Sequence, residues 1–296
     1  MPKYIILGHE NPDVDSIVSG YIYQNYLRRK NIDVDFIIPD KHIDDDTLEI
    51  CRRFHLEPTD FQKPLEYDDN TKFILVDHHN RKGLKNIELI IDHHLDEHEP
   101  DTSNCINELS SSTSCLIIQG NEPFYSYHEL ELACMAAMVD TASFHSTKSC
   151  EWDLDWINKM VEEKGTDYDK IYEAGLSIND ISNPKTAMLN GLKKYEIHGH
   201  NVESSSIHVN GMNNNWKNIN KIVNLLQEYV LDKDLDYFLF IIHDMDKFET
   251  WLYTIDKFGF IRKKYPEYTS RGTTIIPEFE EDLKYTPKIK IKTDNN

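Results

Sequence analysis

The stretch KYIILGHENPDVDS, residues 3–16, predicts the first strand, turn and helix of the fold. Residues 4–7 are apolar, which is typical of a short buried strand. The apolar spacing of residues 17–29 predicts a helix that ends in a basic turn. His9, Asp13 and Asp15 lie on the turn between them, where a proline-containing loop lets them converge without helical spacing. We therefore expect polar chemistry at the end of the first strand.

Further strand-like runs follow in the first half of the chain, at residues 34–39, 73–76 and 87–91. Helical stretches separate these runs, and this alternation predicts an α/β domain with a parallel sheet flanked by helices. In such sheets the functional residues gather at the carboxyl edge of the strands. Asp77 and Asp92 each follow a strand-like run, as His9 does.

A largely apolar helix is predicted over residues 128–144, in the first half of the chain, and it contains one anomalous acid, Asp140.

The second half of the chain predicts a smaller α+β domain. Residues 177–185, which precede it, have a linker composition. We expect a catalytic domain over residues 1–180, a substrate-binding domain over residues 186–296, and an active site in the cleft between them. The second domain should contain a hairpin, a helix, two further strands and a partly disordered tail, at residues 195–209, 216–231, 237–242, 251–255 and 284–296.

Composition limits the classes of function. The 52 acidic and 32 basic residues give a formal charge of −20, which disfavours nucleic-acid partners. The five cysteines form no C-x-x-C pair and fit reduced thiols. The N-terminus lacks a signal peptide and no run approaches the ~20 apolar residues of a membrane span. These features predict a soluble cytoplasmic protein without membrane partners, which must recruit cations if it binds phosphate.

Four clusters of histidine and aspartate predict a metal centre. They are His9-x-x-x-Asp13-x-Asp15, Asp77-His78-His79, Asp92-His93-His94 and Asp140. Imidazole and carboxylate together suit a divalent transition metal, with Mn²⁺ or Co²⁺ favoured over the oxygen-preferring Mg²⁺. Aspartates can also bridge two metals about 3.5–4 Å apart, because each carboxylate has two oxygens.

Each cluster also has a simpler structural interpretation. Asp13, in Asn-Pro-Asp, has the context of a turn or helix N-cap. A His-His pair is most often surface or partly buried structure, and Asp140 could be a hydrogen-bonded helix residue. The convergence of three strand ends and one helix on the same residue types favours the metal site.

The chain resembles the DHH phosphoesterase superfamily, and within it the family II, manganese-dependent inorganic pyrophosphatases. The resemblance rests on five ordered motifs in roughly residues 4–155: GHENPDVDS at 8–16, VDHHN at 76–80, IDHH at 91–94, SSSTS at 110–114 and DTASFHS at 140–146. The second half resembles the family's substrate domain more weakly, through GLKKY at 191–195 and TSRGTTIIP at 269–277.

The resemblance implies a role for each matching residue. His9 and Asp13 would hold one metal, Asp15 and His93 a second, and Asp77 and Asp140 would bridge both. Asp92 would orient a ligand imidazole. Catalysis would involve Asp77, Asp140 and His94, with His94 also donating to the substrate. Lys193 and Arg271 would bind phosphate oxygens. The implied cofactors are two Mn²⁺ or Co²⁺, with Mg²⁺ accompanying the substrate.

The implied activity is hydrolysis of pyrophosphate to two phosphates by a hydroxide that two metals activate. The family's Ser-Arg-Lys-Lys is Ser-Arg-Gly-Thr here, with Gly272 in place of a lysine, and its Asp-His-Asn is Asp77-His78-His79. These departures leave open an exopolyphosphatase-like hydrolase of short polyphosphate or nucleoside polyphosphate, unless Lys247 or residues 262–264 supply the charge. A DHH nuclease and an inactive scaffold are further alternatives, and homodimer formation is an open option.

Overall fold

The computed structural model describes residues 3–79, 83–94, 102, 104–119 and 121–284. The chain divides into two compact units, residues 1–177 and 178–296. Within the described residues, no helix has both the length and the apolar composition that crossing a membrane requires. The predicted disordered tail lies outside the described residues, apart from its first residue, Lys284.

The first unit is built on a five-stranded sheet in the order β2-β1-β3-β4-β5, and all four strand pairs are parallel. This confirms the predicted parallel sheet. The strands are β1 (Tyr4–Leu7), β2 (Val34–Ile37), β3 (Lys72–Val76), β4 (Ile87–Asp92) and β5 (Cys105–Asn107). The short β5 was not predicted, because three residues that are not fully buried leave no hydrophobic pattern to detect.

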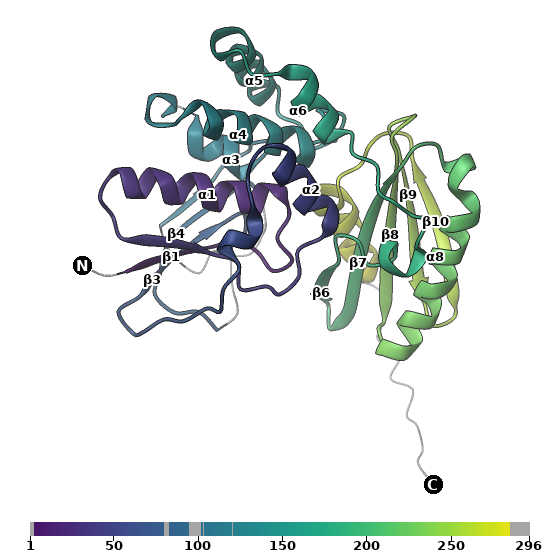
Figure 1. Cartoon of the computed structure of the whole chain (residues 1–296). Helices are drawn as coiled ribbons and strands as arrows, with labels where there is room; N and C mark the ends of the chain where they lie inside the picture. The colour runs from purple at the N-terminus through teal and green to yellow at the C-terminus, as the bar shows by residue number, and fades with distance from the viewer. Residues whose placement is uncertain (1–2, 80–82, 95–101, 103, 120, 285–296) are drawn as a thin grey trace. The chain divides into compact units, whose positions relative to one another are not determined.

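The helices of the first unit pack on one face of this sheet, as Figure 1 shows for α1, α3 and α4. Side chains such as Ile6, Ile74 and Ile91 point into this helix layer, while Ile5, Leu75 and Ile90 form a smaller cluster on the opposite face. The helices are α1 (Val14–Arg29), α2 (Asp45–Arg53), α3 (Thr113–Ile118), α4 (Tyr127–Asp140), α5 (Glu151–Lys164) and α6 (Tyr168–Gly175). The alternation of side chains along each strand separates the two clusters.

Helix α4 ends at Asp140, four residues before the predicted end. Ala142, Ser143 and Phe144 all have positive φ, between 49° and 65°, so the helix cannot continue through them. Hydroxyl groups hold this turn: the Thr141 side chain donates to the Ala137 carbonyl and accepts from the Phe144 amide. Because the helix stops there, Asp140 lies at its end.

The second unit contains a mixed five-stranded sheet in the order β10-β9-β8-β7-β6, in which only the β7–β8 pair is parallel. The predicted hairpin is β6 (Lys193–Ile197) with β7 (His200–Val209), and the predicted strands are β8 (Tyr237–Asp244) and β9 (Glu249–Asp256). The edge strand β10 (Gly259–Tyr265) was not predicted, because most of it is exposed and basic. The predicted helix is α8 (Met212–Lys233).

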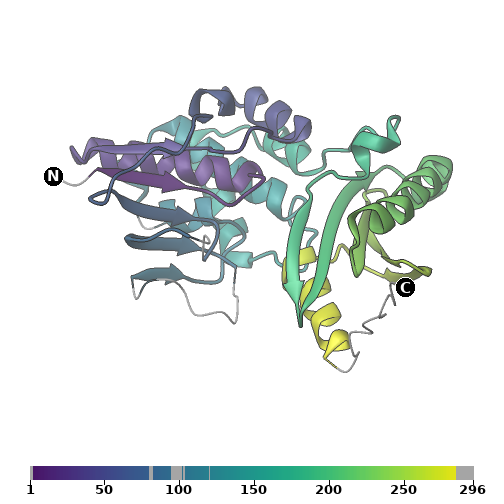
Figure 2. The ribbon, with the colours of Figure 1, turned by 90° about the horizontal axis from the view of Figure 1, so that it is seen from below.

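Two helices cover opposite faces of this second sheet. The buried side of α8 packs on residues such as Phe240, and Phe279 of α9 (Ile276–Leu283) packs on the side of Ile241. Figure 2 shows α8 and the yellow helix α9 on opposite sides of the strands. A short helix α7 (Pro184–Ala187) precedes the sheet, and a π-helical turn (Arg271–Ile275) precedes α9.

Close packing of α1 on the first sheet depends on Gly20. A Cβ at this position would lie 2.2–2.5 Å from ring carbons of Phe36. We expect Gly20→Ala to lower the free energy of unfolding by about 1–3 kcal/mol in urea denaturation, because the buried ring has to move. The same change in a Phe36→Leu background should cost less. Equal costs in the two backgrounds would contradict this contact.

Candidate metal centre

The carboxyl ends of three neighbouring strands bring the predicted ligands together. His9 follows β1, Asp77 follows β3, and His93 follows β4. Since β1, β3 and β4 are adjacent and parallel, their ends meet at one edge of the sheet. Asp13 and Asp15 at the start of α1, and Asp140 at the end of α4, complete the set.

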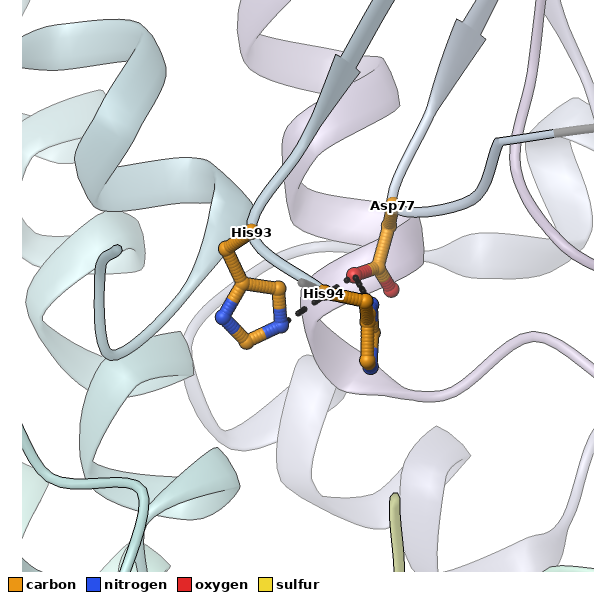
Figure 3. A group of neighbouring side chains, drawn as sticks. All are labelled: Asp77, His93 and His94. Atoms are coloured by element: carbon orange, nitrogen blue, oxygen red, sulfur yellow. Dashed lines mark ion pairs between the residues drawn. The ribbon is translucent and has the colours of Figure 1, made fainter. Parts of the chain in front are cut away.

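Asp77 lies between two groups of side chains. Its Oδ2 is 3.4 Å from Nε2 of His9, and its Oδ1 is 3.5 Å from Nε2 of His93 and 3.6 Å from Nδ1 of His94. Figure 3 shows both His93 and His94 approaching Asp77. The residue has a φ of 65°, an unfavourable conformation for an aspartate that the surrounding structure must stabilise.

The first group consists of His9, Asp13 and Asp77. Nε2 of His9 lies 3.2 Å from Oδ2 of Asp13. The other carboxylate oxygen of Asp13 accepts the Ser16 amide and caps α1. The N-cap interpretation of Asp13 is therefore correct, but the cap uses only one of its oxygens. His9 has its Nδ1 2.8 Å from the Glu10 carbonyl, which makes Nδ1 the protonated nitrogen and leaves the Nε2 lone pair facing the two aspartates.

The second group consists of Asp15, His93 and Asp140. Nε2 of His93 is 3.4 Å from Oδ2 of Asp140. Asp140 belongs to this group alone among the described residues, whereas Asp77 contacts members of both groups. The geometry therefore gives a spanning position to Asp77 but does not give one to Asp140.

Burial and neighbouring charges act on the carboxylates of this site. Burial, followed by the charge of Asp77, raises the pKa of Asp15 to about 8. Burial would also raise the pKa of Asp77, but the neighbouring imidazoles of His9 and His94 keep it below the usual value. Asp15 is thus held beside the negative charge of Asp77, and each of the two carboxylates is 2% exposed.

The donor set fits a bound metal. Within the described part of the chain, Nε2 of His93 is buried without a hydrogen-bond partner, although two carboxylates lie 3.4–3.5 Å away. A buried lone pair in this position is costly unless a cation binds it. The residues that would hold divalent ions are the two groups above. Their mixed nitrogen and oxygen donors suit Mn²⁺.

The structure gives Asp92 a different partner from the one expected. Nδ1 of His93 lies 2.8 Å from the Ser110 carbonyl, so Asp92 does not orient this predicted ligand. Asp92 instead accepts from the amide and Nδ1 of His94, and its other oxygen lies 2.7 Å from Nδ1 of His79. Contacts with His79 and His94 hold the pKa of Asp92 well below its usual range, although burial opposes this. His79, which stands where the Asp-His-Asn motif has asparagine, is therefore an additional buried partner of Asp92.

Two residues at the site were missed in the sequence. Lys148 forms an ion pair with Asp140, and its side chain is only 14% exposed. Asp153 holds the serine-rich segment 110–114 against the predicted ligands. Lys148 could have been predicted from the sequence, because it lies eight residues after Asp140 in the same turn region. Asp153 had no such signal, because it lies in an ordinary acidic first turn of α5.

In the second unit, Arg271 donates to the Gly191 carbonyl at 2.6 Å, which places it near the strand that begins at Lys193. Gly272 is exposed in the π-helical turn. Residues 262–264, the basic run considered as a substitute for the lysine missing at position 272, contact other side chains. Lys263 pairs with Glu278, Lys264 pairs with Glu249, and Arg262 lies over the Trp251 ring.

We expect chelator-treated protein to bind Mn²⁺ in a calorimetric titration, and Asp77→Asn to weaken that binding. The loss should exceed the ~10–100-fold that removal of an orienting residue costs, because Asp77 contacts both groups. Asp33→Asn, which removes an exposed carboxylate, is the matched control and should bind like the wild type. Unchanged affinity in Asp77→Asn would exclude this carboxylate as a ligand.

Comparisons with known proteins agree with this geometry. Residues 3–141 match the DHH family, N-terminal domain. The chain is 24% identical over 259 residues to a Listeria welshimeri protein, with 82% of each chain covered, and 22% identical over 262 residues to an Oceanobacillus iheyensis protein, with 83% of each covered. Both relatives are named probable manganese-dependent inorganic pyrophosphatases.

A crystal structure from Methanococcus jannaschii, provisionally named a family II inorganic pyrophosphatase, has the same fold. The TM-score is 0.75 at 18% identity, over 94% of this chain and 98% of that one. The similarity in fold thus extends over nearly the whole chain, and the match to the DHH family, N-terminal domain, covers residues 3–141.

Proposed function

We propose that the protein is a manganese-dependent inorganic pyrophosphatase, which hydrolyses pyrophosphate to two phosphates. The observation that carries this proposal is that Asp77 connects the two ligand groups: it is a member of the first, and its Oδ1 lies 3.5 Å from Nε2 of His93 in the second. A single structural metal would need one closed set of ligands. Two adjacent groups that one carboxylate connects suit two ions close together, the arrangement used for displacement at phosphorus. The names of the relatives support the same activity.

In the proposed arrangement, His9, Asp13 and Asp77 hold one ion, and Asp15, His93 and Asp140 hold the other, with Asp77 shared. When bound, the two ions supply Lewis acidity toward phosphate oxygens and lower the pKa of water. His9 and His93 are prepared as ligands, because carbonyl groups accept from Nδ1 of each ring and leave Nε2 for the metal.

His94 is placed to act on the substrate. Its Nδ1 donates to Asp92, which fixes the ring and leaves Nε2 for the substrate; donation from Nε2 to a phosphate oxygen requires the imidazolium form, in which both nitrogens carry a proton. Its side chain is 34% exposed, unlike His93 at 3%, so a ligand can contact it. We assign phosphate binding in the second unit to Lys193 and Arg271, of which Arg271 can donate two parallel hydrogen bonds.

The first test is phosphate release from pyrophosphate, tripolyphosphate and long-chain polyphosphate, measured side by side with Mn²⁺. We expect pyrophosphate to be hydrolysed fastest, chelator to stop the reaction, and Mn²⁺ or Co²⁺ to restore it better than Zn²⁺. Asp140→Ala should be inactive while its circular dichroism spectrum stays that of the wild type. A ranking led by the long chains would replace the proposed substrate, and activity that withstands chelator would reject the metal mechanism.

The second candidate function is hydrolysis of longer phosphate chains, which the glycine at position 272 favours because it removes one cation from the substrate domain. We expect Gly272→Lys to improve pyrophosphate binding by up to about 1.5–3 kcal/mol, the scale of a charged hydrogen bond, seen as a lower KM. Asn213→Lys, which adds the same charge at an exposed position of α8, is the control and should leave KM unchanged. An unaltered KM in Gly272→Lys would mean that another residue already supplies this charge.

A further inference from the structure

The serine-rich segment, residues 110–114, connects ligands that come from three different elements. Its first carbonyl, that of Ser110, accepts from Nδ1 of His93. The backbone amide of Thr113 donates to Oδ2 of Asp15 at 2.7 Å, and the amide of Ser114 donates to Oδ1 at 3.0 Å. The Thr113 hydroxyl donates to Oδ1 of Asp77 at 3.2 Å. One short segment therefore sets the positions of three proposed metal ligands.

These contacts also determine how each ligand is presented. A carbonyl can only accept, so Ser110 fixes the His93 tautomer with a proton on Nδ1 and a lone pair on Nε2. Asp15 has one backbone donor on each oxygen, which fixes the plane of its carboxylate. Displacement of the segment would therefore disturb His93 and Asp15 together.

Asp153 holds this segment in place from α5. Its Oδ2 accepts from the Ser111 amide and from the Ser110 hydroxyl, and its Oδ1 accepts from the Gln119 side chain just after α3. The side chain is 1% exposed. A buried carboxylate is retained only when hydrogen bonds compensate its desolvation, and these three bonds all go to residues 110–119.

A purely structural role is the competing explanation. Asp153 lies in the first turn of α5, where an acid stabilises the helix N-terminus. An acid in that role can remain in solvent, however, and does not need to contact a segment that lies some 40 residues earlier in the chain. Its burial against the Ser110 hydroxyl and the Ser111 amide gains no helix stability that an exposed acid would not also provide.

We propose that Asp153 is a positioning residue of the metal centre, acting through residues 110–114 on Asp15, Asp77 and His93. The proposal rests on the proposed metal site. The Asp153 oxygen that accepts from Ser110 and Ser111 fixes the position of residues 110–114, and these residues fix the positions of the three proposed ligands. Asp153 itself binds neither metal nor substrate.

The test is calorimetric titration of Mn²⁺ into chelator-treated protein, together with thermal unfolding of the metal-free form. We expect Asp153→Ala to lower Mn²⁺ affinity by ~10–100-fold, the range for loss of a residue that orients ligands. Asp153→Asn should stay near wild-type affinity. Its side-chain carbonyl can accept from Ser110 and Ser111, and its amide can donate to the side-chain oxygen of Gln119 once the Gln119 amide has turned over. This recovery by the neutral isostere separates hydrogen-bond geometry from charge.

The matched control is Ile157→Ala, which removes a fully buried side chain from the same helix and makes no contact with the segment through a polar group. It should lower the unfolding temperature while leaving Mn²⁺ affinity unchanged. If Asp153→Ala does not fold, Ser110→Ala removes one hydrogen bond to Asp153 and should still weaken Mn²⁺ binding. Wild-type affinity in the variant that folds, or an equal loss in Ile157→Ala, would overturn the proposal. Absence of Mn²⁺ binding by the wild type would instead overturn the proposed function.

Discussion

The buried carboxylate of Asp77 is the interaction on which the site depends. It is 2% exposed, it follows a central strand, and its two oxygens face two different imidazoles, His9 and His93. In a medium from which water is largely excluded, a charge in this position is unfavourable unless cations surround it. The Thr113 hydroxyl supplies part of that compensation by donating to Oδ1 of Asp77, and burial beside Asp77 raises the pKa of Asp15 to about 8. The fold therefore brings two buried carboxylates, those of Asp15 and Asp77, to the same site.

The parallel sheet explains why this deficit lies at one edge. Strands β1, β3 and β4 are neighbours in space, although they are separated in sequence by tens of residues, and their carboxyl ends coincide. Successive side chains at the end of a strand point in different directions. Asp92 consequently contacts His79 and His94, whereas the next residue, His93, contacts Ser110 and the two metal-site aspartates. The adjacent residues Asp92 and His93 therefore belong to two different networks of polar contacts.

Much of this arrangement could be predicted from the sequence, because it depends on local patterns. Apolar runs followed directly by Asp or His identify both the strands and the residues at their ends, and these predictions are met for β1, β3 and β4. The contacts that could not be predicted join positions far apart in the chain, such as Asp153 with Ser111 and His79 with Asp92. No local pattern distinguishes Asp153 from any other acid in a first helical turn. The strand β10 was missed for another reason, since an exposed basic edge has no alternating hydrophobic signal.

The distribution of cations separates the chemistry of the reaction from the choice of substrate. The ligand groups that meet at Asp77 lie wholly in the first unit, so they would serve any phosphoanhydride equally. In the proposed function, discrimination by chain length would fall to the cations of the second unit. There Lys263 and Lys264 are engaged by glutamates, while Arg271 is oriented by the Gly191 carbonyl. A small, densely charged anion depends on every available cation, whereas a longer chain can spread its contacts over more residues. Under this proposal, Gly272 would bear on which substrate is preferred and would leave the metal centre unchanged.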